Sequence, residues 1–239
     1  MTIVGDKGYV TNWGSGLDSL DDYVAVINLT TNTIENNTIS LDEGVEQITA
    51  VNNKLYVTHK GAWSTNNIVS VVDLNNSNSV TEIEVNYIPD EIIVDDSDNI
   101  IVLCQANPLT YNDDYSVVLT VVGTSSITFI DTESDEVERE ITFPETQRAD
   151  FMSYDSGKIY YYQGSTSKVY QIDESATELA TQGIDVGTIY GMSVRGSELY
   201  TVSYAFTNLS EFKAYDVSSG EELYSSGVGV GASKIYFND

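Results

Sequence analysis

Aromatic side chains gather in a few polar segments of this 239-residue chain, and these are the residues best suited to recognising another molecule. Both tryptophans lie in such segments, Trp13 in WGSGLDSLDD at 13–22 and Trp63 in KGAWSTNN at 60–67. Exposed indole and phenol rings stack on sugar rings or flat macrocycles and anchor protein partners. The alternative is that the rings fold back and seal the loops. The candidate ligand-binding residues are Trp13, Trp63, His59, Tyr87, Tyr111, Tyr115, Tyr190 and Phe206.

Acidic side chains accompany these rings and could accept hydrogen bonds from hydroxyls, from amides or from a cationic partner. They are Asp18, Asp21, Asp22, Asp42, Glu43, Asp90, Asp113 and Asp114. Over the whole chain 37 acidic residues stand against 10 basic ones, a net charge of −27. Nucleic acids are bound through Lys and Arg, so this charge argues against a nucleic-acid partner and against anionic membranes. A plain solvated, salt-tolerant surface explains the same charge.

Residues that could perform catalysis are scarce. The only histidine is His59. Its counterparts in the repeats described below are Asn12, Cys104, Gln163 and Ser203, which share no acid–base chemistry. The segment DDSDN at 95–99 begins like a calcium loop but lacks the glycine and the distant glutamate of an EF-hand, so it favours a turn. The sequence predicts no catalytic residue, no metal site and no cofactor.

The elements that position these residues are repeats. A hydrophobic strand ending in Asp or Asn recurs five times, and its last residues are Asn28, Asp73, Asp131, Asp173 and Asp216. These markers lie 45, 58, 42 and 43 residues apart. Between them stand pairs of short strands around a polar turn, as in EQITAVNNKLYVTH at 46–59. A period of about 40–45 residues with four strands indicates a β-propeller blade. The marker carboxylates are expected to bind backbone amides of the turns that follow them.

We name the strands of each repeat A to D, from the inner to the outer strand, with the marker at the end of strand C. The repeats then cover about 8–53, 54–99, 100–157, 158–197 and 198–239 of one domain. The B–C connections are long and variable, and the longest, at 105–126, has room for an extra hairpin. Long loops on a rigid scaffold commonly carry binding residues. Both ends of the chain read as strand A, which leaves open a closed five-bladed ring or five blades of a larger one.

The segments GYVTNWGSG and DYVAVINLTTNTI within 8–34, and LYVTHKGAWSTNNIVSVVDLNNSNSV at 55–80, resemble the YVTN-repeat family of β-propellers. The resemblance extends over the whole chain, although later repeats read IVLC, YYYQ and YTVS in place of YVTN. Members of this family are secreted or surface-exposed bacterial proteins related to surface-layer propellers, usually with seven blades. Surface lipoproteins of Bacteroidetes are similar in their acidic, Asn/Thr-rich style, and some of them capture corrinoids. The resemblance implies an extracellular or outer-surface location.

The sequence thus predicts an all-β propeller of four-stranded antiparallel blades. Its expected function is non-enzymatic capture of a ligand, a corrinoid or a glycan, or of a surface protein, on the B–C loops. Two alternatives stay open: a structural or adhesive module of a surface array, and a propeller hydrolase or lactonase. No apolar run is long enough to span a membrane, and no leader is visible in this chain. The single cysteine, Cys104, rules out an intrachain disulfide.

Overall fold

The computed structural model describes residues 1–15, 18, 20–61, 65–106, 109–111, 117–119, 123–145, 147–203, 205 and 207–237, with the backbone alone at 109–111 and 117–119. Contacts within the chain define two compact units, Met1–Arg148 and Ala149–Asp239. The boundary falls between two sheets, after β15 (Glu136–Thr142) and before β16 (Phe151–Asp155). One cooperative domain over the whole chain stays a prediction.

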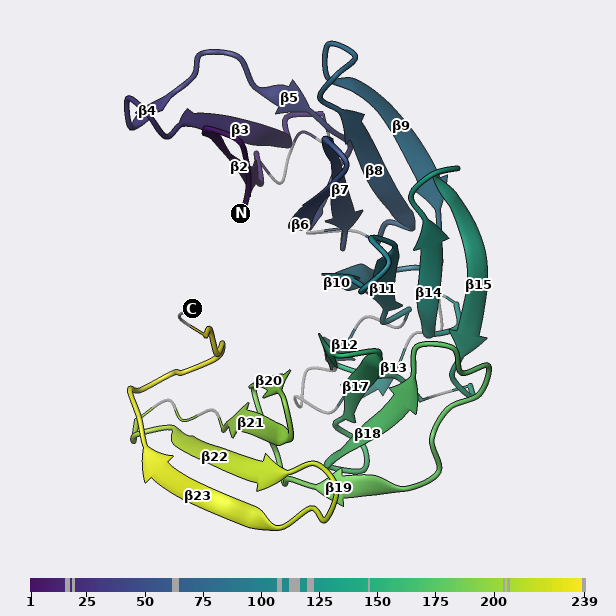
Figure 1. Ribbon diagram of the computed structural model, residues 1–239, viewed down its shortest axis with the longest axis vertical. Coiled ribbons are helices and arrows are strands. Elements are labelled where there is room, and N and C mark those ends of the chain that lie inside the picture. The colour runs from purple at the N-terminus through teal and green to yellow at the C-terminus, as the bar shows by residue number, and fades with distance from the viewer. Residues whose placement is uncertain are drawn as a thin grey trace. The chain divides into compact units, whose positions relative to one another are not determined.

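The first unit contains three large sheets, whose strands pair in the order of the chain, and one two-stranded sheet inserted into the third (Figure 1). The first sheet holds β1 (Thr2–Val4), β2 (Lys7–Asn12), β3 (Tyr23–Asn28), β4 (Thr33–Ile34) and β5 (Ile39–Ser40), with β4 and β5 both paired to β3. The second holds β6 (Val45–Val51), β7 (Lys54–His59), β8 (Ile68–Asp73) and β9 (Ser79–Glu84). The third holds β10 (Pro89–Val94), β11 (Ile100–Cys104), β14 (Ser126–Asp131) and β15 (Glu136–Thr142).

The second unit contains two further sheets of the same kind. One holds β16 (Phe151–Asp155), β17 (Lys158–Gln163), β18 (Lys168–Asp173) and β19 (Gly183–Asp185). The other holds β20 (Gly191–Arg195), β21 (Glu198–Val202), β22 (Glu211–Asp216) and β23 (Glu222–Gly227). All strand pairs are antiparallel, and the described residues include no helix. The predicted all-β architecture of four-stranded antiparallel blades is confirmed, with strands A to D in sequence order and each sheet starting at strand A.

The long third connection carries an additional hairpin, as its length predicts. Strands β12 (Leu109–Tyr111) and β13 (Val117–Leu119) pair antiparallel, with Leu109 opposite Leu119. This two-stranded sheet is separate from the four-stranded sheet that it interrupts. The insertion accounts for the longest distance between two markers.

The apolar strands pack blade against blade. All five residues of β11 are buried, as expected for the continuous apolar run IIVLC. Between the second and third sheets one cluster of buried residues includes Tyr56, Val69, Val71, Ile83, Ile100 and Ile130. Neighbouring sheets are also joined by polar bonds, since Thr11 Oγ1 donates to the carbonyl oxygen of Glu46 (2.8 Å) and Thr58 Oγ1 to that of Asp90 (3.0 Å). The threonine of the YVT segments therefore links each of these blades to the next.

The marker residues hold the C–D turns, as predicted. Asp131 Oδ1 accepts the amide protons of Glu133 (2.8 Å) and Ser134 (2.9 Å), and Asp73 Oδ1 accepts that of Asn75 (2.9 Å). Asn28 and Asp216 accept two turn amides each. Asp173 differs, because its carboxylate forms an ion pair with Lys158 of the neighbouring strand. In the DDSDN segment, Asp95 Oδ1 accepts the amides of Ser97 and Asn99, both at 2.8 Å, so this segment forms a turn.

The C-terminal segment differs from the sequence prediction of a further strand A. Residues 228–237 contain no strand. They run beside β20, where a Cβ on Gly191 would overlap the carbonyl of Ser233 and the Arg195 guanidinium lies 5.1 Å from the centre of the Phe237 ring.

Candidate binding site

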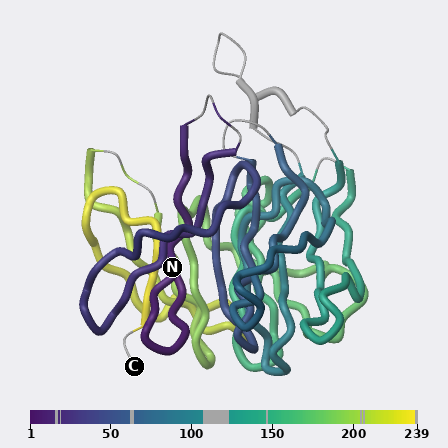
Figure 2. The backbone as a smooth tube through the Cα atoms, turned by 90° about the horizontal axis from the view of Figure 1, so that it is seen from above, coloured from purple at the N-terminus to yellow at the C-terminus, as the bar shows by residue number. Residues whose placement is uncertain are grey.

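The site predicted from the sequence is formed by two kinds of connection. One kind joins strand B to strand C within a blade, and the other joins strand D to strand A of the next blade. Strands of the first unit run between two ends of the sheets, and both kinds of connection emerge at the same end (Figure 2). We call this the B–C end. It carries Trp13, Asp22, the segment Glu43–Val45 and Tyr87. The A–B and C–D turns occupy the opposite end.

Asp22 holds two connections of the B–C end together. Its side chain is buried, and Oδ1 accepts the amide proton of Gly14 at 2.7 Å. Its Oδ2 accepts the amide protons of Gly44 at 2.6 Å and of Val45 at 3.4 Å. Charged acceptors form the stronger hydrogen bonds to backbone amides. Asp22 therefore joins the first B–C loop to the D–A connection that enters the second blade.

Gly44 permits an unusually close approach of two backbones. Gly44 and Gly61 have φ angles of 87° and 100°, and the Gly61 amide lies 3.4 Å from the Gly44 carbonyl oxygen. A Cβ on Gly44 would overlap the Gly61 backbone. Only glycine meets both requirements without strain. The second B–C loop therefore begins in contact with the same D–A connection that Asp22 binds.

Trp13 presents its ring from this fixed backbone. Its indole N–H donates to the Val45 carbonyl oxygen, so the polar group of the side chain is already bonded within the protein. Nevertheless 48% of the residue surface remains exposed. A ring that is held at its polar edge and open over much of its surface is suited to stacking or apolar contact.

His59 supports the same connection from below the surface. It is 0% exposed, with Nδ1 3.2 Å from the Glu43 carbonyl oxygen and Nε2 2.8 Å from Ser70 Oγ. A carbonyl can only accept, so Nδ1 carries the proton and Ser70 donates to Nε2. Burial lowers the pKa of the imidazole, which keeps it neutral. His59 therefore positions Glu43–Val45, and its ring does not reach the surface.

Asp90 is a second buried carboxylate with internal partners. Its Oδ2 accepts from Lys60 Nζ at 2.6 Å and from Gln105 Nε2 at 2.9 Å. Lys60 begins the second B–C loop and Gln105 the third, so one carboxylate joins both. The sequence offered Asp22 and Asp90 as acceptors for a ligand. In the structure both carboxylates accept hydrogen bonds from donors of the protein itself. Without these carboxylates, burial would leave those donors without partners.

Tyr87 is half-buried beside an uncommon backbone conformation. Ile88 has a φ of 59°, a region that β-branched residues rarely adopt. Its amide donates to the Asn66 carbonyl (2.8 Å), and its carbonyl accepts from the Gln105 amide (2.9 Å). Bonds on both sides thus hold the strained residue. Such strain is found preferentially at binding and switch sites.

The structure adds none of the remaining candidate residues to this group. Tyr190 lies in the second unit and is 49% exposed. Tyr111 belongs to β12, whose side chains are not described. Trp63, Tyr115 and Phe206 lie outside the described residues. Of the predicted set, the structure brings Trp13 and His59 to the same segment, where Trp13 bonds to the carbonyl of Val45 and His59 to that of Glu43.

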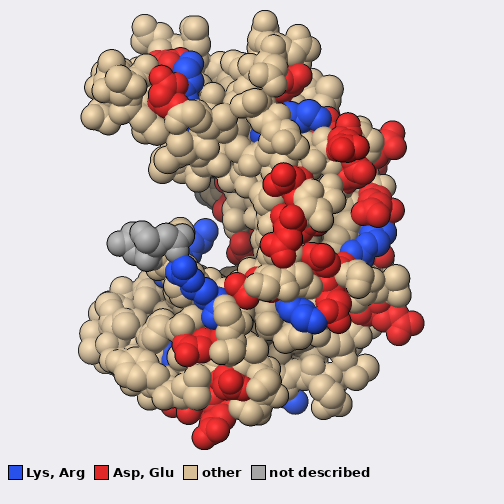
Figure 3. Space-filling model, in the orientation of Figure 1, with Lys and Arg blue, Asp and Glu red and all other residues tan. Residues whose placement is uncertain are grey.

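Groups that could support chemistry at this end are few in the described part of the chain. Cys104 is buried, and burial raises the pKa of its thiol to about 12, so it stays protonated at neutral pH. No three His, Cys, Asp or Glu side chains among the described residues are placed to hold a metal ion. Within the same residues, no helix is long and apolar enough to cross a membrane. Acidic side chains are spread over the face shown in Figure 3, with basic ones between them.

Comparison with known proteins supports the fold alone. No protein-family model matches the sequence, and no curated protein matches it significantly. Solved structures do match. One is the Dos1 propeller, with a TM-score of 0.60 and 12% identity over 93% of this chain and 59% of that one. Another is hydrazine synthase of Kuenenia stuttgartiensis, with a TM-score of 0.60 and 14% identity over 83% of this chain and 58% of that one. A nidogen–laminin complex also matches (0.58, 12%, 93% and 76%). The chain spans less than two thirds of the first two proteins' lengths. It has a β-propeller fold.

Proposed function

We propose that this protein is a non-enzymatic binding propeller that holds a ligand or a partner at the B–C end of its blades. The observation that carries the proposal is the geometry of Trp13. The residue is 48% exposed while its indole N–H is bonded to Val45, and Asp22 holds both the adjoining Gly14 and the segment that contains Val45. A rigid aromatic surface binds with little loss of side-chain entropy.

The class of ligand follows from the surface and from the resemblance to YVTN-repeat propellers. A net charge of −27 disfavours phosphates and nucleic acids and leaves neutral or cationic molecules. The corrin of a corrinoid is a flat macrocycle that an indole can stack on, and a glycan offers the apolar face of a sugar ring. We place the protein outside the cell or on its outer surface, as the YVTN resemblance implies.

A protein partner is the second candidate. One structural neighbour comes from a complex of nidogen with laminin, so a chain of similar fold takes part in a protein–protein complex. An exposed, preorganised tryptophan is also a common anchor of protein interfaces. In this case the chain is a structural or adhesive module, and a small molecule does not compete for Trp13.

Calorimetric titration with cyanocobalamin tests the first candidate. We expect measurable binding to the unmodified protein, at least a tenfold weaker affinity in Trp13→Ala, and affinity close to the original in Trp13→Phe, which keeps an aromatic ring. Equal affinity in all three proteins would remove the B–C end as the site. No heat with the unmodified protein would remove the corrinoid and leave glycans and protein partners to be titrated in the same way.

A further inference from the structure

A cavity of about 400 Å³ opens in the second unit, between the sheet of the fourth blade and the C–D turn of the fifth. One wall comes from β17–β19 of the fourth blade and includes Tyr160, Gln171, Ile184 and Asp185. The other wall is the C–D turn of the fifth blade, with Ser218 and Gly220. Small-molecule sites commonly have volumes of about 300–1,000 Å³. The cavity is therefore large enough for a ligand of its own.

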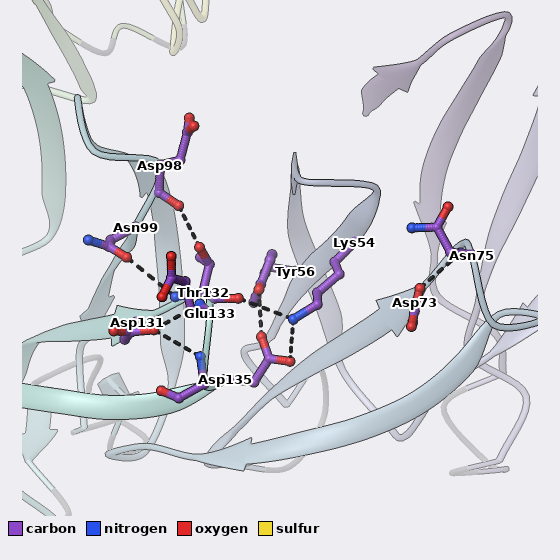
Figure 4. A network of polar contacts seen from close by, with 11 residues as sticks. Lys54, Tyr56, Asp73, Asn75, Asp98, Asn99, Asp131, Thr132, Glu133 and Asp135 are labelled. Carbon is purple, nitrogen blue, oxygen red and sulfur yellow. Dashed lines mark hydrogen bonds and ion pairs between the residues drawn. The ribbon is translucent and has the colours of Figure 1, made fainter.

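The corresponding place in the first unit is filled by a polar network (Figure 4). There Asp135, in the C–D turn of the third blade, accepts from Lys54 Nζ and from the Tyr56 hydroxyl of the second blade, both at 2.6 Å. Lys54 also donates to the carbonyl of Thr132 at 3.1 Å. One carboxylate thus closes the crevice between two neighbouring blades.

The repeat aligns Gly220 with Asp135. Each follows its marker, Asp216 or Asp131, by four residues, and each has a left-handed φ, 72° at Gly220 and 56° at Asp135. Tyr160 corresponds to Tyr56, because each pairs with strand C two residues before the marker. The C–D turn of the fifth blade therefore keeps the backbone conformation of the turn in the third blade, but it lacks the aspartate side chain. The space that the carboxylate fills in the first unit lies open in the second.

Neighbouring replacements make this space polar. Val71 is buried in the apolar cluster of the first unit, whereas Gln171 at the same repeat position is exposed and lines the cavity. The Tyr160 residue is buried, and within the described residues its hydroxyl has no hydrogen-bond partner, unlike that of Tyr56. Asp185 accepts the Gly187 amide with Oδ1 at 3.2 Å.

The lining combines amide, hydroxyl and carboxylate groups with the apolar side chains of Val169, Ile184 and Val217, and it includes no Lys or Arg. An anion would find no positive charge here, and a purely apolar molecule would leave the polar groups without partners. A neutral ring that has hydroxyls on its edge and C–H groups on its face matches both parts of the lining.

We propose that this cavity is a second binding site, for a neutral hydroxylated small molecule of monosaccharide size. It binds the ligand between the fourth and fifth blades, through the hydroxyl of Tyr160, the amide of Gln171 and the carboxylate of Asp185. The site shares no residue with the one proposed around Trp13 in the first unit and does not depend on the function proposed there.

Saturation-transfer NMR on the full chain tests the site. The probes are the methyl α-pyranosides of glucose, galactose and mannose, with glucose 6-phosphate as the anionic comparison, each at about 20 mM so that a millimolar Kd is detected. We expect transfer to at least one neutral sugar and none to the phosphate. Transfer to none of the three sugars, or equal transfer to the phosphate, overturns the proposal.

Gly220→Asp fills the cavity with the side chain that closes the crevice of the first unit. A Cβ on Gly220 meets only Ile184, at 3.4 Å, so the turn accommodates the substitution. Gly196→Asp is the matched control, because Gly196 has a similar φ of 63° and a Cβ there meets nothing within 4 Å. We expect at least a tenfold loss of sugar affinity in the first variant and no change in the second. Unchanged binding in Gly220→Asp locates the sugar elsewhere and overturns the site.

Tyr160→Phe is a milder second variant, which removes only the hydroxyl. We expect a loss of about three- to tenfold in sugar affinity, the usual effect of one neutral hydrogen bond. The melting temperature of each variant shows whether it is folded. Binding as in the unmodified protein removes Tyr160 from the site and with it the proposed mode of recognition.

Discussion

The crevice between the second and third blades and the crevice between the fourth and fifth blades share one turn but differ in what fills them. In both, a marker aspartate accepts the amides of the second and third residues after it, which are Glu133 and Ser134 in the first unit and Ser218 and Ser219 in the second. The carboxylate of Asp135 closes the first crevice and Gly220 leaves the second open. The comparison shows that a repeat can keep its backbone and create a cavity through single side chains.

The largest expected effect comes from moving the polar residue of the open crevice into the closed one. Val71→Gln places an amide within the cluster of Tyr56, Val69 and Ile83, where Val71 is 2% exposed. A buried amide without partners costs about 3 kcal/mol. We expect the free energy of unfolding, measured by urea denaturation, to fall by about that amount.

The reverse substitution in the second unit is the control. Gln171→Val changes an exposed residue on a cavity wall, so we expect less than about 0.5 kcal/mol of change. If the two substitutions destabilise the protein equally, the two crevices do not differ in burial as described.

Removing the carboxylate that closes the first crevice should have a smaller effect. Asp135→Gly leaves the Tyr56 hydroxyl and the Lys54 ammonium without the partner they share. We expect a loss of about 2 kcal/mol in the free energy of unfolding, because both hydrogen bonds involve a charged group. Glycine relieves the left-handed strain at this position and offsets part of the loss.

Asp98→Gly is the matched control for this substitution. Asp98 has a φ of 63° in the A–B turn of the same blade, and within the described residues its carboxylate has no hydrogen-bond partner. We expect no destabilisation there, since only strain is removed. A loss at Asp98 as large as that at Asp135 would show that the effect arises from the turn and not from the bridge between blades.

The strands, their order and their turns could be predicted from the sequence because each depends on local pattern. The five markers recur with the residue types that a C–D turn requires, and the excess length at 105–126 signals the hairpin β12–β13. The segment GASKIYFND at 231–239 was predicted as a strand A, and its described residues, 231–237, contain no strand. Its pattern suits a strand A, but a strand also needs a neighbour to pair with, and a local pattern does not reveal pairing.

The site was less predictable because it depends on which residues meet in space. Trp13 was found by its type and its place in a loop. The roles of Asp22 and Asp90 were not, since an acid that binds buried amides looks in sequence like an acid free to bind a ligand. The open crevice was missed as well. Aligning the repeats position by position does reveal it, because glycine stands at 220 where aspartate stands at 135.

The smallest expected effect concerns the turn that the two crevices share, and it tests whether their backbones are truly alike. Hydrogen bonds from Ser218 and Ser219 lower the pKa of Asp216 to about 2, and backbone bonds from Ser134 and Glu133 lower that of Asp131 below its usual 3.8. A carboxylate with a depressed pKa stabilises the fold at pH values above its unfolded pKa of 3.8. This contribution is lost as the pH falls through the folded pKa.

Amide NMR shifts of Ser218, Ser219, Glu133 and Ser134, followed from pH 5 downward, should therefore titrate below 3.8 in both turns, with a midpoint near 2 at Asp216. Asp216→Asn should abolish the titration at Ser218 and Ser219 and leave that at Glu133 and Ser134 intact. A midpoint at the ordinary value in either turn would mean that its carboxylate is not held as the other is, and the difference between the crevices would then extend to their backbones.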